Sequence, residues 1–131
     1  MFNIVCHSMG YAYALGIIDK LQSANIKFGR FYIIAPENAG SGAVPYGFEE
    51  VWQYGSNEKK QLCFLQDGVA PQTQVLGIDN LPSGTIGGRV YIPDGLSTMG
   101  YAGSHMISNY GWIFNIKYDP NTPNGYVKAR K

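Results

Sequence analysis

The feature that most constrains the fold is a serine placed where an apolar strand runs directly into a helix. Residues 2–6 form a short run of strand-forming side chains that ends just before Ser8. The segment after Ser8 carries apolar residues at helical spacing, namely Leu15, Ile18 and Leu21. An abrupt turn from strand to helix holds its corner residue in a strained conformation with the side chain exposed. The sequence therefore predicts an α/β unit whose corner presents the Ser8 hydroxyl.

The residues of this corner are similar to those of one known family. His7-Ser8-Met9-Gly10 after an Ile-Val strand resembles the nucleophile elbow of the α/β-hydrolases, the lipase and esterase superfamily. The elbow needs small residues two positions before and after the serine, because the strand and helix backbones nearly touch there. Gly10 meets the second requirement, and Cys6 meets the first approximately. The alternative is an ordinary strand–loop–helix junction in which Ser8 only N-caps the helix.

The rest of the chain continues the alternation of strands and helices. Further strands are expected over 30–35, 61–65 and 89–93, and a last helix over 106–118, whereas residues 48–54 are ambiguous between a helical turn and an extended piece. This order predicts an α/β sheet of about four mostly parallel strands with flanking helices and right-handed crossovers. Together with the resemblance, this order implies a partial α/β-hydrolase fold.

The length of 131 residues favours a single domain over residues 1–131. The resemblance covers nearly all of the chain, but the chain corresponds only to the C-terminal half of a family member, from the nucleophile elbow onward. The strands that precede the nucleophile in the family have no counterpart. The chain is therefore either the C-terminal part of a longer protein, or its missing half is supplied in another way.

The resemblance implies a triad whose serine, acid and histidine follow one another along the chain. Ser8, Asp67 and His105 occur in this order. Asp67 begins Asp-Gly-Val-Ala-Pro after a predicted strand, similar to the turn where the family places its acid, and His105 lies in a Gly/Ser loop before the last helix. Asp94 also follows a predicted strand and is the alternative acid. The backbone N–H of Met9 would be one oxyanion donor, and the second normally comes from a loop earlier in the fold.

The chemistry explains why these residue types are needed together. Serine is a poor nucleophile unless an imidazole takes its proton, and a carboxylate must orient that imidazole and stabilise its charge. All three side chains would lie at the carboxyl ends of parallel strands, where open α/β sheets place their sites. His7 is a neighbour of the nucleophile in sequence, but its side chain is expected to point away from the site.

Composition excludes several other classes of function. The formal net charge of +1 gives no electrostatic footprint for nucleic acid, and no apolar run reaches transmembrane length. The start of the chain lacks a signal-peptide pattern, so localisation is open, with a cytoplasmic default. Cys6 and Cys63 form no CxxC pair and no metal-ligand spacing with the histidines, so no metal or cofactor is expected. We expect the two cysteines to be unbonded, because the strand over 31–35 should separate them.

Two functions from different classes follow. The chain is either a serine hydrolase of esterase or lipase type, acting on a small-molecule or lipid ester, or a non-catalytic fragment of such an enzyme. Without the preceding strands, one side of the strand Phe2–Cys6 becomes an open edge that would pair with another chain. We expect a homo-oligomer in which this strand pairs antiparallel with its own copy, with weak or absent esterase activity.

Overall fold

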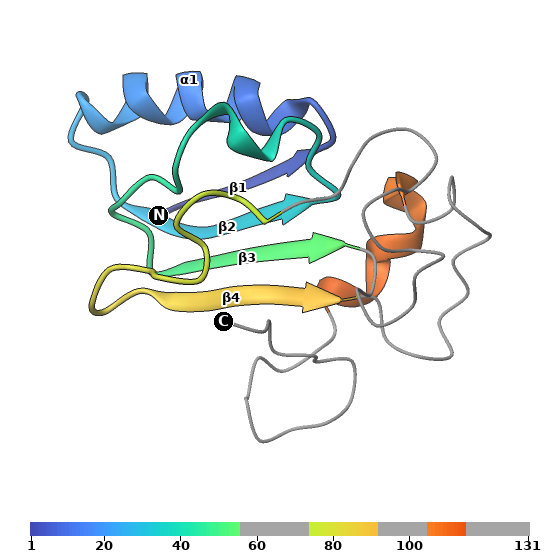
Figure 1. Cartoon of the computed structure of the whole chain (residues 1–131). Coiled ribbons are helices and arrows are strands. Elements are labelled where there is room, and N and C mark those ends of the chain that lie inside the picture. Colours follow the sequence, from blue (N-terminus) through green and yellow to red (C-terminus); the bar gives the residue numbers. More distant parts are fainter. Residues whose placement is uncertain (56–73, 92–104, 115–131) are drawn as a thin grey trace.

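The described part of the chain is built on four parallel strands. The computed structural model describes residues 1–55, 74–91 and 105–114. In chain order the elements are strand β1 (Phe2–His7), helix α1 (Gly10–Gln22), strand β2 (Phe28–Ile34), the short 3-10 helix η1 (Ala39–Ser41), strands β3 (Glu50–Gly55) and β4 (Ile86–Tyr91), and the 3-10 helix η2 (Ile107–Phe114). The strands lie in the order β1-β2-β3-β4, and every neighbouring pair is parallel (Figure 1). The α/β class expected from the sequence is confirmed.

The third strand and the last helix differ from the sequence-based expectation. β3 is formed by Glu50–Gly55, within the segment that the sequence left ambiguous, and the predicted strand 61–65 lies outside the described residues. The last helix is a 3-10 helix over Ile107–Phe114, and the remainder of the predicted 106–118 helix after residue 114 is also outside them. Gly111, a poor helix former, lies inside this segment and disfavours a regular α-helix there.

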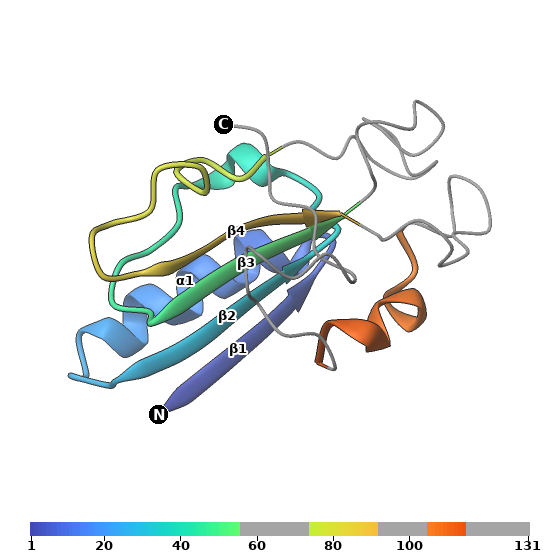
Figure 2. The same cartoon turned by 90° about the horizontal axis from the view of Figure 1, so that it is seen from below.

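Both faces of the sheet are covered, because side chains of a strand alternate between its faces. One apolar core lies between the sheet and α1, and it includes Phe31 and Ile33 of β2. A second core on the opposite face joins Tyr32 and Ile34 of the same strand to residues of η2. The two views of the chain place α1 along one face of the sheet and η2 at the carboxyl ends of the strands (Figures 1 and 2). Near-complete burial of β2 is typical of a strand inside a parallel sheet.

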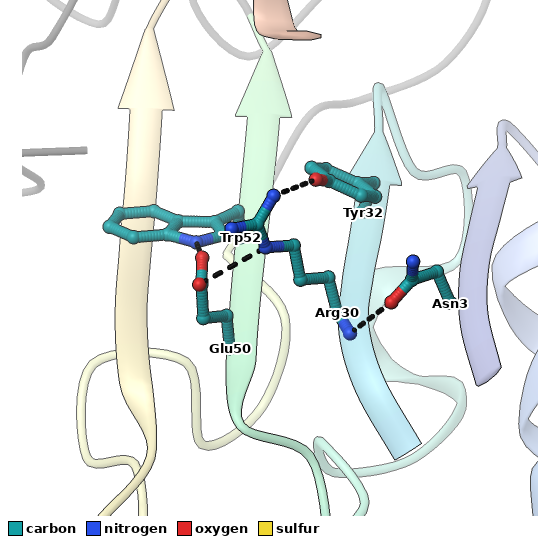
Figure 3. Close-up of polar contacts among 5 residues, drawn as sticks. All are labelled: Asn3, Arg30, Tyr32, Glu50 and Trp52. Atoms are coloured by element: carbon teal, nitrogen blue, oxygen red, sulfur yellow. Dashed lines mark hydrogen bonds and ion pairs between the residues drawn. The ribbon is translucent and has the colours of Figure 1, made fainter. Parts of the chain in front are cut away.

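A polar network near the amino ends of the strands fixes how they pair. The register between β1 and β2 is irregular near the start of β1. There the backbone N–H of Arg30 donates to the side-chain oxygen of Asn3 at 2.8 Å (Figure 3). The Arg30 guanidinium donates to Glu50 at 3.1 Å and to the hydroxyl of Tyr32 at 3.4 Å, and the indole N–H of Trp52 donates to Glu50 at 3.0 Å. This network ties three neighbouring strands together at the end opposite Ser8.

The segment before β4 is held against the sheet by buried polar contacts. The side-chain oxygen of the buried Gln53 accepts the backbone N–H of Val75 at 2.8 Å. Arg89 of β4 makes two hydrogen bonds of 3.2 Å to the carboxylate of Asp79. β4 runs very close to β3 at Gly87. A Cβ atom built at this residue would lie 1.8 Å from a carbonyl oxygen of β3. Only glycine fits at that position.

None of the helices in residues 1–55, 74–91 and 105–114 has the length and apolarity needed to cross a membrane.

Candidate active site

Ser8 sits at a tight and strained corner between β1 and α1. β1 ends at His7 and α1 begins at Gly10, so only two residues make the turn. Ser8 has a φ angle of 58°, in the left-handed region that non-glycine residues rarely adopt. Strand and helix approach closely, since a Cβ atom built at Gly10 would lie 3.8 Å from that of Cys6. The backbone thus has the sharp strand-to-helix corner that the sequence predicted.

The Ser8 side chain does not cap the helix. The N-cap residue of α1 is Met9, and no side chain makes a capping hydrogen bond there. The Ser8 hydroxyl instead faces His105 and Glu37, while its backbone carbonyl accepts the N–H groups of Tyr11 at 3.3 Å and Glu37 at 3.1 Å. The interpretation in which Ser8 only N-caps the helix is therefore wrong, because the hydroxyl is engaged elsewhere.

His105 meets Ser8 across the carboxyl edge of the sheet. Its Nε2 atom lies 2.8 Å from Ser8 Oγ, and its exposed fraction is only 9%. The histidine precedes η2, which is anchored to the sheet by the buried side chains of Tyr110 and Ile113. Hydrogen-bond distance between a hydroxyl and an imidazole nitrogen is what proton transfer from a serine nucleophile requires. The structure thus brings together two residues that are 97 positions apart in the chain.

The side chain of His7 points toward the site, whereas the sequence predicted that it would point away. Its Nε2 atom hydrogen-bonds to the backbone carbonyl of His105, and the two rings lie 5.0 Å apart. The reason is the alternation of side chains along β1. Cys6 belongs to the core on the α1 face, so His7, one residue later, points to the opposite face, where the segment before η2 packs. His7 therefore contacts the backbone that carries the candidate base.

Glu37 is a site residue that sequence reasoning missed. It follows β2 and is half-buried, and its Oε2 atom accepts a hydrogen bond from Ser8 Oγ at 3.3 Å. The signal that could have found it is its position just beyond the carboxyl end of the predicted strand beside that of Ser8, where polar side chains of parallel sheets converge. Glu37 contacts the serine hydroxyl rather than the imidazole, so it does not stand where the acid of a Ser-His-Asp triad would.

Met9, the predicted oxyanion donor, follows Ser8 in the turn and is the N-cap residue of α1. Its backbone already has helical dihedral angles, with φ −62° and ψ −17°. The first N–H groups of a helix lack partners inside the helix and carry partial positive charge. The Met9 side chain is 62% exposed, so the start of this helix is open to solvent.

The two candidate acids, Asp67 and Asp94, both lie outside the described residues. The same holds for Cys63, so its separation from Cys6 stays a prediction. Cys6 itself is a free, buried thiol, and burial raises its pKa to about 12 against a partly compensating backbone hydrogen bond from Ile34. Because the thiolate is the nucleophilic form, the protonated Cys6 thiol is a poor nucleophile at neutral pH.

Within residues 1–55, 74–91 and 105–114, no cluster of His, Cys, Asp and Glu could hold a metal ion. Comparison of the chain with protein-family models, with curated proteins and with solved structures gives no significant match.

Proposed function

We propose that this chain is a serine hydrolase with a partial α/β-hydrolase fold, and that it acts on a carboxylic ester through Ser8 and His105. One observation carries the proposal: a strained serine at a strand–helix corner lies 2.8 Å from the Nε2 atom of a buried histidine. Backbone strain of this kind persists only where the rest of the fold holds it in place, and it clusters at functional sites. Helix capping does not explain the position of Ser8, because no side chain makes a capping hydrogen bond at the start of α1.

In the proposed reaction, the Nε2 atom of His105 takes the hydroxyl proton as Ser8 Oγ attacks the ester carbonyl. The leaving alcohol then receives this proton, and water hydrolyses the acyl-enzyme by the same route. The Met9 N–H would donate to the oxyanion, and one such donor contributes about 3 kcal/mol in serine hydrolases. Asp67 is proposed as the acid that orients His105, with Asp94 as the alternative.

Covalent labelling tests the nucleophile without requiring fast turnover. A fluorophosphonate should add one phosphonyl group to the folded protein, as Ser8 Oγ displaces fluoride, and the added mass should disappear in Ser8→Ala. The matched control is Ser23→Ala, which removes an exposed hydroxyl bonded only to the Lys20 carbonyl and should label like the wild type. Unlabelled wild type, or equal labelling of Ser8→Ala, would contradict the proposal. Parallel Asp67→Asn and Asp94→Asn variants identify the acid by the larger loss of labelling rate.

One observation favours a second proposal, that the chain associates with a copy of itself. β1 is an edge strand of the described sheet. The N–H groups of Phe2 and Ser8 bond to the β2 side, so those of the alternate residues Asn3, Val5 and His7 point outward. The apolar side chains beside this edge are exposed, including Phe2 at 54% and Val5 at 48%.

We propose that β1 pairs antiparallel with the β1 of a second copy, which would satisfy these outward groups in one continuous sheet. Light scattering should then give the mass of a dimer, and Val5→Lys should give a folded monomer, because charge on an edge strand opposes pairing. A monomeric wild type would contradict this arrangement. The Ser8 labelling experiment is independent of that result.

A further inference from the structure

Glu37 places a negative charge directly beside the candidate nucleophile, and hydrogen bonds hold its backbone there. Its N–H donates to the Ser8 carbonyl at 3.1 Å, and its Oε2 atom lies 3.3 Å from Ser8 Oγ. The turn that carries it has two residues in the left-handed region, Ala35 with φ 41° and Asn38 with φ 56°. The N–H of Ala35 is bonded to the carbonyl of Tyr54 at 2.8 Å. These contacts hold the backbone of Glu37 beside Ser8, and from there its carboxylate reaches the serine hydroxyl.

The charge of Glu37 is not neutralised by a cation in the part of the chain that the structure describes. The two ion pairs found there join Arg30 to Glu50 and Arg89 to Asp79, and the side-chain contact of Glu37 is with the Ser8 hydroxyl. That hydroxyl has one proton, which can be donated either to His105 or to Glu37 but not to both. When His105 takes the proton, the carboxylate faces the serine oxygen with no hydrogen bond between them.

Glu37 also faces the negative charge that would develop during the proposed reaction. Attack of Ser8 Oγ moves negative charge onto the carbonyl oxygen of the ester, only a few bond lengths from Glu37. Two like charges so close, in a partly buried site, oppose each other. A positive group on the substrate, placed next to Glu37, would reverse the sign of that interaction, whereas a neutral or anionic ester would not.

We propose that Glu37 is a specificity-determining residue and that the preferred substrates are esters carrying an ammonium group within a few bonds of the scissile carbonyl. The inference rests on the proposed function, because it names the substrate class of that same site. Glu37 would contact the ammonium group through its carboxylate while Ser8 attacks the neighbouring carbonyl. A half-buried carboxylate makes such a contact stronger than it would be at a fully exposed position.

The test compares two thioesters of the same shape and different charge, acetylthiocholine and S-(3,3-dimethylbutyl) thioacetate. In each, acetyl transfer to Ser8 breaks the carbon–sulfur bond, the thiol leaves with the proton from His105, and water releases acetate. A thiol reagent follows the product. We expect the wild type to prefer the cationic ester by about tenfold in kcat/KM, which corresponds to about 1.4 kcal/mol. Glu37→Gln should bring the ratio close to one, and Glu37→Asp should retain a preference for the cation.

Added salt should reduce the preference of the wild type and leave Glu37→Gln unaffected, because the interaction is between charges. An equal ratio in wild type and Glu37→Gln would overturn the proposal, as would a wild type that prefers the neutral ester. Either result would leave Ser8-dependent hydrolysis itself intact.

A second readout does not depend on catalysis. Titration of choline into the Ser8→Ala protein should shift the amide resonances around Glu37, and the same titration of the Ser8→Ala/Glu37→Gln protein should not. If neither thioester is hydrolysed, fluorophosphonate labelling of Ser8 still decides the proposed function, and choline binding decides the role of Glu37. Absence of choline-induced shifts in Ser8→Ala, or unchanged shifts in the double variant, would refute the assignment of a cation site.

Discussion

The strain at Ser8 makes a sharp prediction about stability. Ser8→Ala and Ser8→Gly both remove the hydroxyl and with it the contacts to His105 and Glu37. The two variants then differ only in the presence of a Cβ atom at a residue whose φ angle is 58°. Any difference in their stability therefore reports the cost of that Cβ atom in the left-handed conformation, together with the difference in flexibility of the unfolded chains.

The two contributions have opposite signs. At ordinary positions alanine is more stable than glycine by about 0.5–1 kcal/mol, because glycine loses more conformational freedom on folding. In the left-handed region a Cβ atom costs roughly 1–2 kcal/mol through its contact with the following carbonyl oxygen. We expect the steric cost to be larger, so Ser8→Gly should be more stable than Ser8→Ala by about 1 kcal/mol. For a chain of this length that difference corresponds to about 4 °C in Tm.

Thermal unfolding followed by circular dichroism measures the difference. The matched control is Ala12→Gly at an exposed position in the first turn of α1, where the usual order applies and glycine should lower the stability by up to about 1 kcal/mol. A Ser8→Ala protein as stable as Ser8→Gly, or more stable, would refute the assignment of strain to Ser8. It would also remove the main physical reason for treating this corner as a functional one.

Three further predictions test the site and the sheet that carries it. His7→Phe should slow fluorophosphonate labelling by up to about tenfold, because one hydrogen bond to the His105 carbonyl is lost. His7→Gln retains a donor near the same position, so its labelling rate should be close to that of the wild type. Cys6 has a pKa of about 12 in the folded state against 9.0 for an ordinary thiol. Above pH 9 the thiol ionises in the unfolded chain but not in the folded one, so the free energy of unfolding should fall, by about 1 kcal/mol at pH 10. Urea unfolding at pH 8 and pH 10 should show a smaller decrease for Cys6→Ala, and an equal decrease would contradict the buried thiol. Gly87→Ala should lower the free energy of unfolding by about 1–3 kcal/mol, whereas Gly16→Ala, with open space around it in α1, should raise it.

Sequence reasoning succeeded where the signal is local. The corner at Ser8 depends on residues close to one another in the chain, and their apolar spacing distinguishes the strand from the helix. β3 was harder to recognise, because the polar Gln53 interrupts the apolar run Val51–Tyr54. The structure shows that Gln53 is buried and accepts the N–H of Val75, 22 residues away. A buried polar residue with a distant partner cannot be distinguished from a surface residue by periodicity alone.

The contacts of Ser8 could likewise be predicted from the sequence only in part. The resemblance to the α/β-hydrolases implied that Ser8 and His105 meet, and their side-chain atoms lie 2.8 Å apart. The contact from Ser8 to Glu37 depends on β2 lying next to β1, which the sequence predicts only in outline. His7 could have been placed from its parity in β1 alone, since it must face away from the helix that Cys6 contacts.

The site is assembled from the ends of three elements, and this explains why its parts depend on one another. β1 supplies His7 and leads to Ser8, β2 leads to Glu37, and the segment before η2 supplies His105. Parallel pairing of β1 and β2 brings the first two ends to the same edge, while the packing of η2 against the opposite face from α1 brings the third. A change in the η2 core can therefore move His105 without touching Ser8. Conversely, strain at Ser8 persists only while strand pairing and helix packing both hold the corner.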